Sequence, residues 1–267
     1  MLTSQNYHAD TTHVSKSGLD LINHSPLHYW HKYLNPNREP EEEKPALIFG
    51  RLAHTLMFEP EKFERDFVES PKFDRRTKEG KAGHEAFSLS VNGRTPVLAD
   101  AIIEAQMLVD AAKLHPNVDA LLAMPGQAET VFVWQDAETG VMCKCRPDWV
   151  TEDGWILDLK STTDATPEAF GRSAFNYRYH VQASYYIDGY YAATGNTPKG
   201  FVFIAVEKEQ PNYVAVYYAT DEQIELGRIA YKKDLQVYAE CKRTGIWNAP
   251  APAKPLQLPA YAFKQEN

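Results

Sequence analysis

The segment CKCRPDWVTEDGWILDLKSTT, residues 143–163, decides the fold of this chain. Apolar runs over Val141–Val150 and Trp155–Thr162 predict two neighbouring strands, and the Asp-Gly that ends the residues between them favours a hairpin turn. Asp158 and Lys160 are two residues apart, so their side chains leave the same face of the second strand. With Asp148 on the first strand, two carboxylates and an ammonium group are expected together at one sheet face.

A cluster of this kind can hold a hard divalent cation and the water that the cation activates. A lone Asp-x-Lys pattern is, however, more often a solvated strand face that carries a surface ion pair. Further residues must therefore decide between the two interpretations.

Two predicted helices supply further polar residues. In ALIFGRLAHTLMFE, residues 46–59, Gly50 and His54 fall four apart on one helix face, and the glycine allows a close approach of another backbone. In YHVQASYYIDGYYAA, Gln182 and Tyr186 lie one helical turn apart. Taken singly, His54 reads as a core histidine, and the Gln182–Tyr186 pair as an aromatic-rich core face. Their joint order along the chain is more specific.

That order, Gly-x-x-x-His, Asp, Asp-x-Lys and Gln-x-x-x-Tyr, resembles the RecB-like branch of the PD-(D/E)xK nucleases. The chain is especially similar to the C-terminal nuclease domain of exonuclease VIII (RecE), a prophage recombination exonuclease. The similarity is carried by VSKSGLDLINHSPLHYW, FGRLAHTLMFEPEKF, PKFDRRTKEGK, TGVMCKCRPDWV, WILDLKSTTD and YRYHVQASYYIDGY, from about Val14 to Val202. One departure is that Asp158 has no extra glutamate beside it, a variation that the branch accepts.

The resemblance implies a metal site. Asp148 and Asp158 would hold one or two Mg²⁺ ions, with help from the Leu159 backbone carbonyl and from His54. One imidazole ligand suggests that Mn²⁺ would also support activity. Glu129, at the start of a predicted strand, is a weaker candidate ligand and could equally be a solvated strand end.

Three more residues receive catalytic roles through the resemblance. Lys160 would orient the attacking water and stabilise charge in the transition state. Gln182 and Tyr186 would position the nucleophile or the phosphate backbone.

Composition bounds these expectations. The chain has 267 residues, of which 43% are hydrophobic, enough for the core of one domain over residues 1–267. It lacks an 18-residue apolar run and a secretory signal, so we expect no membrane partner. Three cysteines, an odd number, indicate a reduced cytoplasmic protein. They are too few for a four-cysteine iron–sulfur cluster, and without a Cys-x-x-Cys pair we expect no zinc.

A net charge of −8 taken alone argues against a nucleic-acid partner, but the basic residues are bunched. A local positive groove on a negative exterior would draw DNA to the active site alone. Single cations in the stretch after Pro71-Lys72 could equally belong to a soluble loop. The candidate DNA-binding residues are Arg75, Arg76, Lys78, Arg146 and Arg178.

The predicted fold is an α/β (α+β) domain with a βββαβ core, a central mixed sheet flanked by helices. Residues 1–13 are predicted to form a disordered arm, and residues 249–267 an extended, proline-rich tail. Helices are expected over residues 15–34, 46–59, 83–91, 99–114, 116–122, 166–175, 179–193 and 221–244. Strands are expected over residues 129–135, 141–150, 155–162, 199–206 and 213–218, the first three as an antiparallel meander.

Three functions are compatible with the sequence. The resemblance implies a 5′-to-3′ exodeoxyribonuclease that acts on linear double-stranded DNA and leaves 3′ tails for a single-strand annealing protein. It also implies a ring-shaped homo-oligomer, a tetramer before a trimer. The alternative is a structure-specific endonuclease or a single-strand exonuclease with the same core. A catalytically silent DNA-end-binding module is less compatible, because Asp158 and Lys160 are both present.

Overall fold

A five-stranded mixed sheet forms the centre of the protein. The computed structural model describes every residue except 1, 4–5, 40–42, 249–252, 254 and 258–267. The strand order is β3-β6-β7-β8-β9, and β7 and β8 are parallel while the other neighbours are antiparallel. The strands are β3 (Gly126–Ala128), β6 (Trp149–Thr151), β7 (Trp155–Thr162), β8 (Gly200–Glu207) and β9 (Val214–Tyr218). The predicted α/β class and βββαβ core are confirmed.

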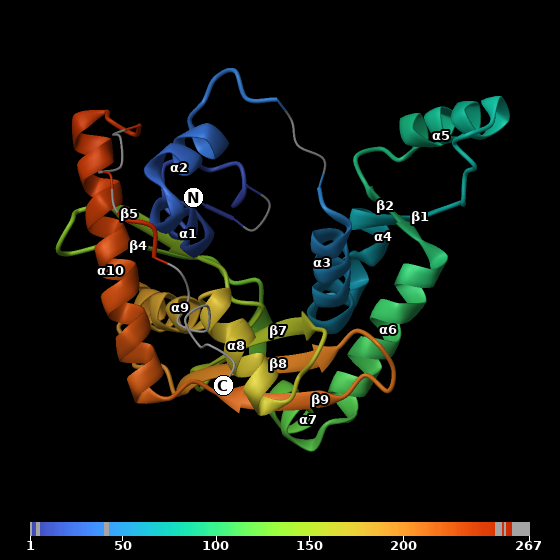
Figure 1. Ribbon diagram of the computed structural model, residues 1–267. Coiled ribbons are helices and arrows are strands. Elements are labelled where there is room, and N and C mark those ends of the chain that lie inside the picture. Colours follow the sequence, from blue (N-terminus) through green and yellow to red (C-terminus); the bar gives the residue numbers. More distant parts are fainter. Residues whose placement is uncertain (1, 4–5, 40–42, 249–252, 254, 258–267) are drawn as a thin grey trace, which may run out of the picture.

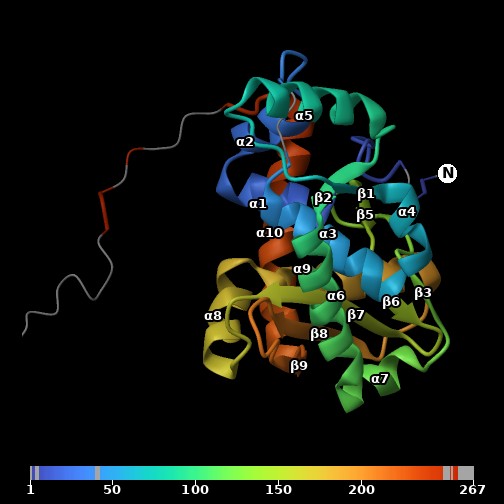
Figure 2. The ribbon, with the colours of Figure 1, turned by 90° about the vertical axis from the view of Figure 1, so that its right-hand side faces the viewer.

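Helices cover both faces of this sheet (Figure 1). Ile156 packs into a core with α1 (Lys16–His24), α9 (Tyr179–Thr194) and α10 (Asp221–Thr244). Leu157 and Leu159 pack into a second core, with α3 (Pro45–Phe58) and α6 (Ala99–Leu114), which lie in front of the strands in Figure 2. The strand alternation thus sends Leu157 and Leu159 to one face and Asp158 to the other, as predicted.

The predicted helix over residues 15–34 is two helices. Ser15 caps α1, and Ser25 ends it. Ser25 then caps α2 (Pro26–Tyr33), with Pro26 in the first turn. Proline lacks the N–H that a continuous helix would need, and it restricts the backbone of the residue before it. The helix is therefore interrupted at Ser25.

The predicted strand over Val141–Val150 is also divided. β5 (Met142–Cys145) pairs with β4 (Phe132–Gln135) in a separate two-stranded sheet, while β6 joins the central one. The single antiparallel meander is therefore wrong. Asp148 lies between β5 and β6, beside Pro147. In the central sheet, β3 takes the place beside β6 that was expected for the strand over residues 129–135.

The parallel pair of β1 (Phe67–Ser70) and β2 (Thr95–Leu98) was not predicted, whereas the helix expected over 83–91 is present and begins earlier, at Lys78. This helix, α5 (Lys78–Ser90), lies between the two strands in sequence and is held away from the central sheet (Figure 1). The start of α5, capped by Thr77, takes up the end of the expected basic loop. The other elements are a 3₁₀ turn (Pro60–Lys62), α4 (Phe63–Asp66), α7 (Pro116–Leu122) and α8 (Pro167–Asn176).

Two smaller points concern caps and membranes. The cap of α10 is Thr220, which forms a capping box with Gln223. Across the described residues, no helix is both long and apolar enough to cross a membrane.

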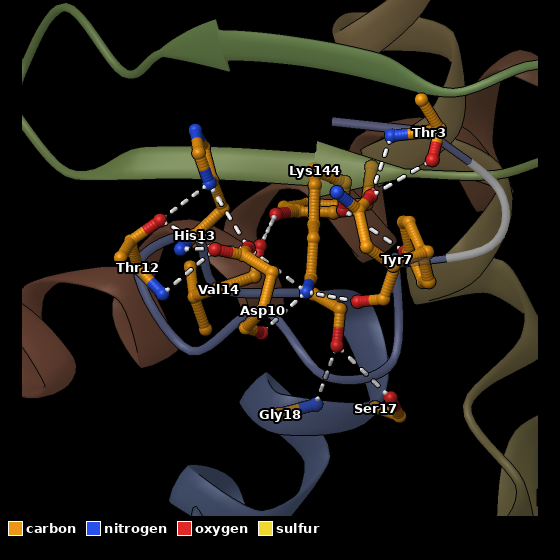
Figure 3. Close-up of polar contacts among 12 residues, drawn as sticks. Thr3, Tyr7, Asp10, Thr12, His13, Val14, Ser17, Gly18 and Lys144 are labelled. Atoms are coloured by element: carbon orange, nitrogen blue, oxygen red, sulfur yellow. Dashed lines mark hydrogen bonds and ion pairs between the residues drawn. The ribbon is translucent and has the colours of Figure 1, made fainter. Parts of the chain in front are cut away.

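The N-terminal segment, residues 6–14, is packed on β5, contrary to the predicted disordered arm (Figure 3). The buried Lys144 ammonium donates to the Tyr7 and Asp10 carbonyls at 2.6 Å each and to Asp10 Oδ2 at 3.1 Å. Val14 forms a parallel bridge with Cys143. An ammonium group that loses water needs such partners, and this segment supplies them. The predicted tail over 249–267 lies almost entirely outside the described residues.

Candidate active site

A hydrogen-bonded group links α3 to the central strand. His54 Nδ1 lies 3.1 Å from Asp148 Oδ1, and His54 Nε2 lies 2.9 Å from the Leu159 carbonyl. Asp148 Oδ2 accepts the Leu159 amide at 2.8 Å. Helix α3 brings the His54 imidazole to the strand, and Asp148 is fixed on both oxygens. The close backbone approach expected at Gly50 is wrong, because a Cβ added there would meet no atom within 4 Å.

The contacts of His54 define its protonation state. Both ring nitrogens face oxygens that can only accept, so both carry a proton and the ring is an imidazolium. Burial alone would lower the pKa of His54, but the Asp148 carboxylate outweighs it and raises the pKa to about 9. For the same pair, burial would raise the pKa of Asp148, and His54 and Lys160 hold it below its ordinary value.

Glu129 joins this group. One ligand atom from each of His54, Glu129 and Asp148 lies within 4.8 Å of the others. Glu129 Oε2 pairs with Arg146 Nε at 2.5 Å, and burial raises the pKa of the Glu129 carboxyl to about 7. Arg146 also lies 3.2 Å from His8 Nε2 and 5.0 Å from the centre of the Tyr7 ring. The candidate DNA-binding Arg146 is thus placed against the metal-ligand candidate Glu129.

Asp158 begins a second chain of contacts beside the first. Its side chain is buried under α9, where Gln182 Nε2 donates to Oδ1 at 2.5 Å and Lys160 Nζ pairs with Oδ2. Burial and then Asp148 raise the pKa of Asp158, against the effect of Lys160. The carboxylates in turn raise the pKa of Lys160 despite its burial, so the ammonium stays charged. This strand face is buried and not the solvated surface of the simpler interpretation.

The remaining α9 residues differ in their contacts. Tyr186 lies one turn beyond Gln182, and its ring packs against Phe201 with centroids 6.1 Å apart. Sequence reasoning missed Tyr179, whose ring centre lies 4.8 Å from Lys160 Nζ. The spacing of Tyr179, Gln182 and Tyr186 at i, i+3 and i+7 on one helix face was the signal that could have found it.

The predicted DNA-binding residues are spread over the molecule. Arg75 and Arg76 lie in the turn before α5, Lys78 is the first residue of that helix, and Arg76 pairs with Asp74 at 2.9 Å. Arg178 instead forms an internal ion-pair group with Asp20 at 3.2 Å and Asp234 at 2.5 Å, which ties α9 to α1 and α10. These contacts give Arg178 a structural position, and we no longer assign it to DNA.

The donor set fits a hard divalent cation. His54, Glu129 and Asp148 offer two carboxylates and an imidazole, and the Leu159 carbonyl is a further oxygen beside them. His54, now an imidazolium between two of these oxygens, would have to lose one ring proton to act as a ligand, because only a deprotonated ring nitrogen offers a lone pair. Asp158 is held next to this group, but its two oxygens contact Lys160 and Gln182.

Comparison with known proteins identifies the family. The model of a PDDEXK-like domain of unknown function (DUF3799) matches residues 15–252. The chain belongs to this family. The match makes the PDDEXK-like domain nearly coextensive with the described chain, and it confirms the superfamily that the sequence resembled.

One solved structure shares the fold of this chain. The PDDEXK-like domain is similar to a “putative exonuclease” from Eubacterium rectale, at 15% identity, with 96% of each chain covered and a TM-score of 0.62. An alkaline exonuclease from Laribacter hongkongensis is 15% identical over 63% of this chain and 87% of its own. The TM-score of that match is 0.27. Among curated proteins none matches.

Proposed function

We propose that this PDDEXK-like domain is a Mg²⁺-dependent exodeoxyribonuclease that acts on the ends of linear double-stranded DNA. The observation that carries the proposal is the junction of two groups at β7. His54, Asp148 and Glu129 form the metal-ligand candidates, and Asp158 with Lys160 lies directly beside them. Family membership and the E. rectale fold support the same class of activity.

Each group has a chemical task in phosphodiester hydrolysis. A bound Mg²⁺ would polarise the scissile phosphate and acidify a water molecule. Lys160 keeps its proton and offers a fixed ammonium to the charge that develops on the phosphate. Gln182 and Asp158 hold that ammonium in place through the contacts on either carboxylate oxygen. Mn²⁺ is expected to substitute for Mg²⁺ because one ligand is an imidazole.

The direction of digestion is part of the proposal. On the basis of the resemblance to exonuclease VIII, we propose that digestion runs from 5′ to 3′. It would leave 3′ single-stranded tails on which an annealing protein could act. Phosphate contacts from Arg75, Arg76 and Lys78 would position the duplex without specifying its sequence. Their joint replacement by alanine should weaken binding evenly across sequences and flatten its salt dependence.

The test is digestion with Mg²⁺ of linear duplexes labelled at the 5′ or 3′ end, beside a closed circular control. Asp158→Asn should lower the rate about 100-fold or more, because it removes the charge that holds Lys160. The matched control is Asp153→Asn, since Asp153 also pairs with a lysine, Lys199, but at the surface. Equal rates for Asp158→Asn and wild type would refute the site. Rapid cleavage of the circle would favour the endonuclease alternative.

Assembly into a ring is also proposed, and two exposed helix faces support it. On α6 the face carries Ile103, Met107, Asp110 and Leu114, and on α10 it carries Leu226, Ile229, Lys233 and Val237. Each helix face is apolar with one charged residue among its apolar ones, the acidic Asp110 on α6 and the basic Lys233 on α10. The two helices lie on opposite sides of the molecule (Figure 1), which suits head-to-tail contacts that close a ring.

A further inference from the structure

Two large aromatic side chains are exposed at the junction of α8 and α9. Phe175 is 66% exposed and Tyr177 is 65% exposed. Phe175 stacks on His180 with centroids 5.9 Å apart and planes 8° from parallel. Tyr177 stacks on Tyr179, at 5.8 Å and 26°. Both rings are therefore oriented by a neighbouring ring while they leave much of their own surface in water.

Ion pairs and a hydrogen bond hold the backbone of the α8–α9 junction in place. Arg178 is in the left-handed region at φ 57°, and its guanidinium forms an ion pair with Asp20 and a hydrogen-bonded ion pair with Asp234. Lys16 Nζ donates to the Tyr177 carbonyl at 3.0 Å. A non-glycine residue holds this conformation at a cost, so the contacts that stabilise it keep the two rings in a defined position.

The junction leads directly to the proposed catalytic residues. Tyr179, on which Tyr177 stacks, has Lys160 Nζ 4.8 Å from its ring centre, and Lys160 pairs with Asp158. Only one aromatic ring therefore separates the exposed Tyr177 from the catalytic ammonium. Arg172, one turn before Phe175 on α8, is exposed and offers a cation nearby.

We propose that Phe175 and Tyr177 form a stacking platform for an unpaired nucleobase of the DNA strand that is being cut. This rests on the proposed nuclease function. A nucleobase is planar and aromatic, and its phosphate is anionic, which matches two exposed rings beside Arg172 and Lys160. Loss of such a stacking contact weakens nucleic-acid binding about 5- to 150-fold and does so with little dependence on sequence.

The experiment uses the inactive Asp158→Asn protein and a linear duplex with a frayed end that carries 2-aminopurine, whose fluorescence falls when it stacks. Binding should quench the probe. Phe175→Ala and Tyr177→Ala should each abolish most of the quenching and weaken binding about 5- to 150-fold. Tyr177→Phe should restore both. The control Tyr191→Ala removes an exposed tyrosine three turns further along α9 and should change neither.

With Asp158 intact, the same alanine variants should raise KM more than they lower kcat. Unchanged quenching and affinity in Phe175→Ala and Tyr177→Ala, with wild-type cleavage intact, would overturn the platform and leave the nuclease proposal standing. A wild-type protein that neither binds nor cuts the duplex would overturn both. Variants that change only the oligomeric mass, with DNA binding unaltered, would assign the rings to a second copy and overturn the platform.

Discussion

Replacement of His54 by glutamine should remove a pH-dependent part of the free energy of unfolding. The folded-state pKa of His54 is about 9, above the ordinary 6.5, because Asp148 stabilises the imidazolium. The folded protein thus binds this proton more tightly than the unfolded chain. The stabilisation is fully present below pH 6.5 and is lost as the pH rises through 9.

The size of the effect follows from the shift. A difference of about 2.5 pK units corresponds to roughly 3 kcal/mol, at about 1.4 kcal/mol per unit. The His54 side chain is 28% exposed, so solvent screening reduces this only in part.

The assay is urea unfolding in EDTA, at about pH 6 and about pH 9.5, of wild type and His54→Gln. The stability difference between the two proteins should shrink by roughly 3 kcal/mol between these pH values. His31→Gln, at an exposed position on α2, serves as the control and should keep the wild-type profile. A wild-type-to-His54→Gln difference that stays constant with pH would refute the imidazolium assignment.

Two further predictions concern charge pairs. Lys144→Met should lower stability by roughly 3–5 kcal/mol, because it leaves the Asp10 carboxylate largely buried without its cation. Lys199→Met, at an exposed position, should cost less than about 1 kcal/mol. Equal losses of melting temperature in the two variants would contradict the role of Lys144 in holding residues 6–14. On the proposed ring contact, Asp110→Lys and Lys233→Asp should each reduce the mass measured by light scattering, and the double variant should restore it. Wild-type mass in both single variants would argue against these faces.

Some of the helices and strands that are determined by neighbouring residues in the sequence were predicted correctly. The helix over 99–114 has the predicted bounds, and the alternation of Leu157, Asp158 and Leu159 gave the faces of β7. The two errors at strands and helices have local causes as well. Pro26 and Pro147 lie inside the two segments that were predicted as a continuous helix and a continuous strand. Because proline has no N–H to donate, these positions predict where each element ends.

Other features depend on distant partners. Glu129, with a left-handed φ of 52°, directly follows β3, and its amide donates to the Asp148 carbonyl at 3.1 Å, so the β3–β6 pairing brings it to the site beside Arg146. Residues 6–13 have no periodic apolar pattern, and their order comes from Lys144, 134 residues away from Asp10. The sequence held the residue types for these contacts but no signal that would bring them together.

The packing of residues 6–14 on β5 has a consequence for synthesis of the chain. Tyr7 is separated by 137 residues from Lys144, the partner that orders it. At about 5–20 residues per second, the ribosome makes that partner roughly 7–27 s after Tyr7. During that interval the aromatic Tyr7 and the bridge-forming Val14 have no β5 to contact. Residues 6–14 therefore reach their native position only after β5 has been made, and they close over a strand that must already exist.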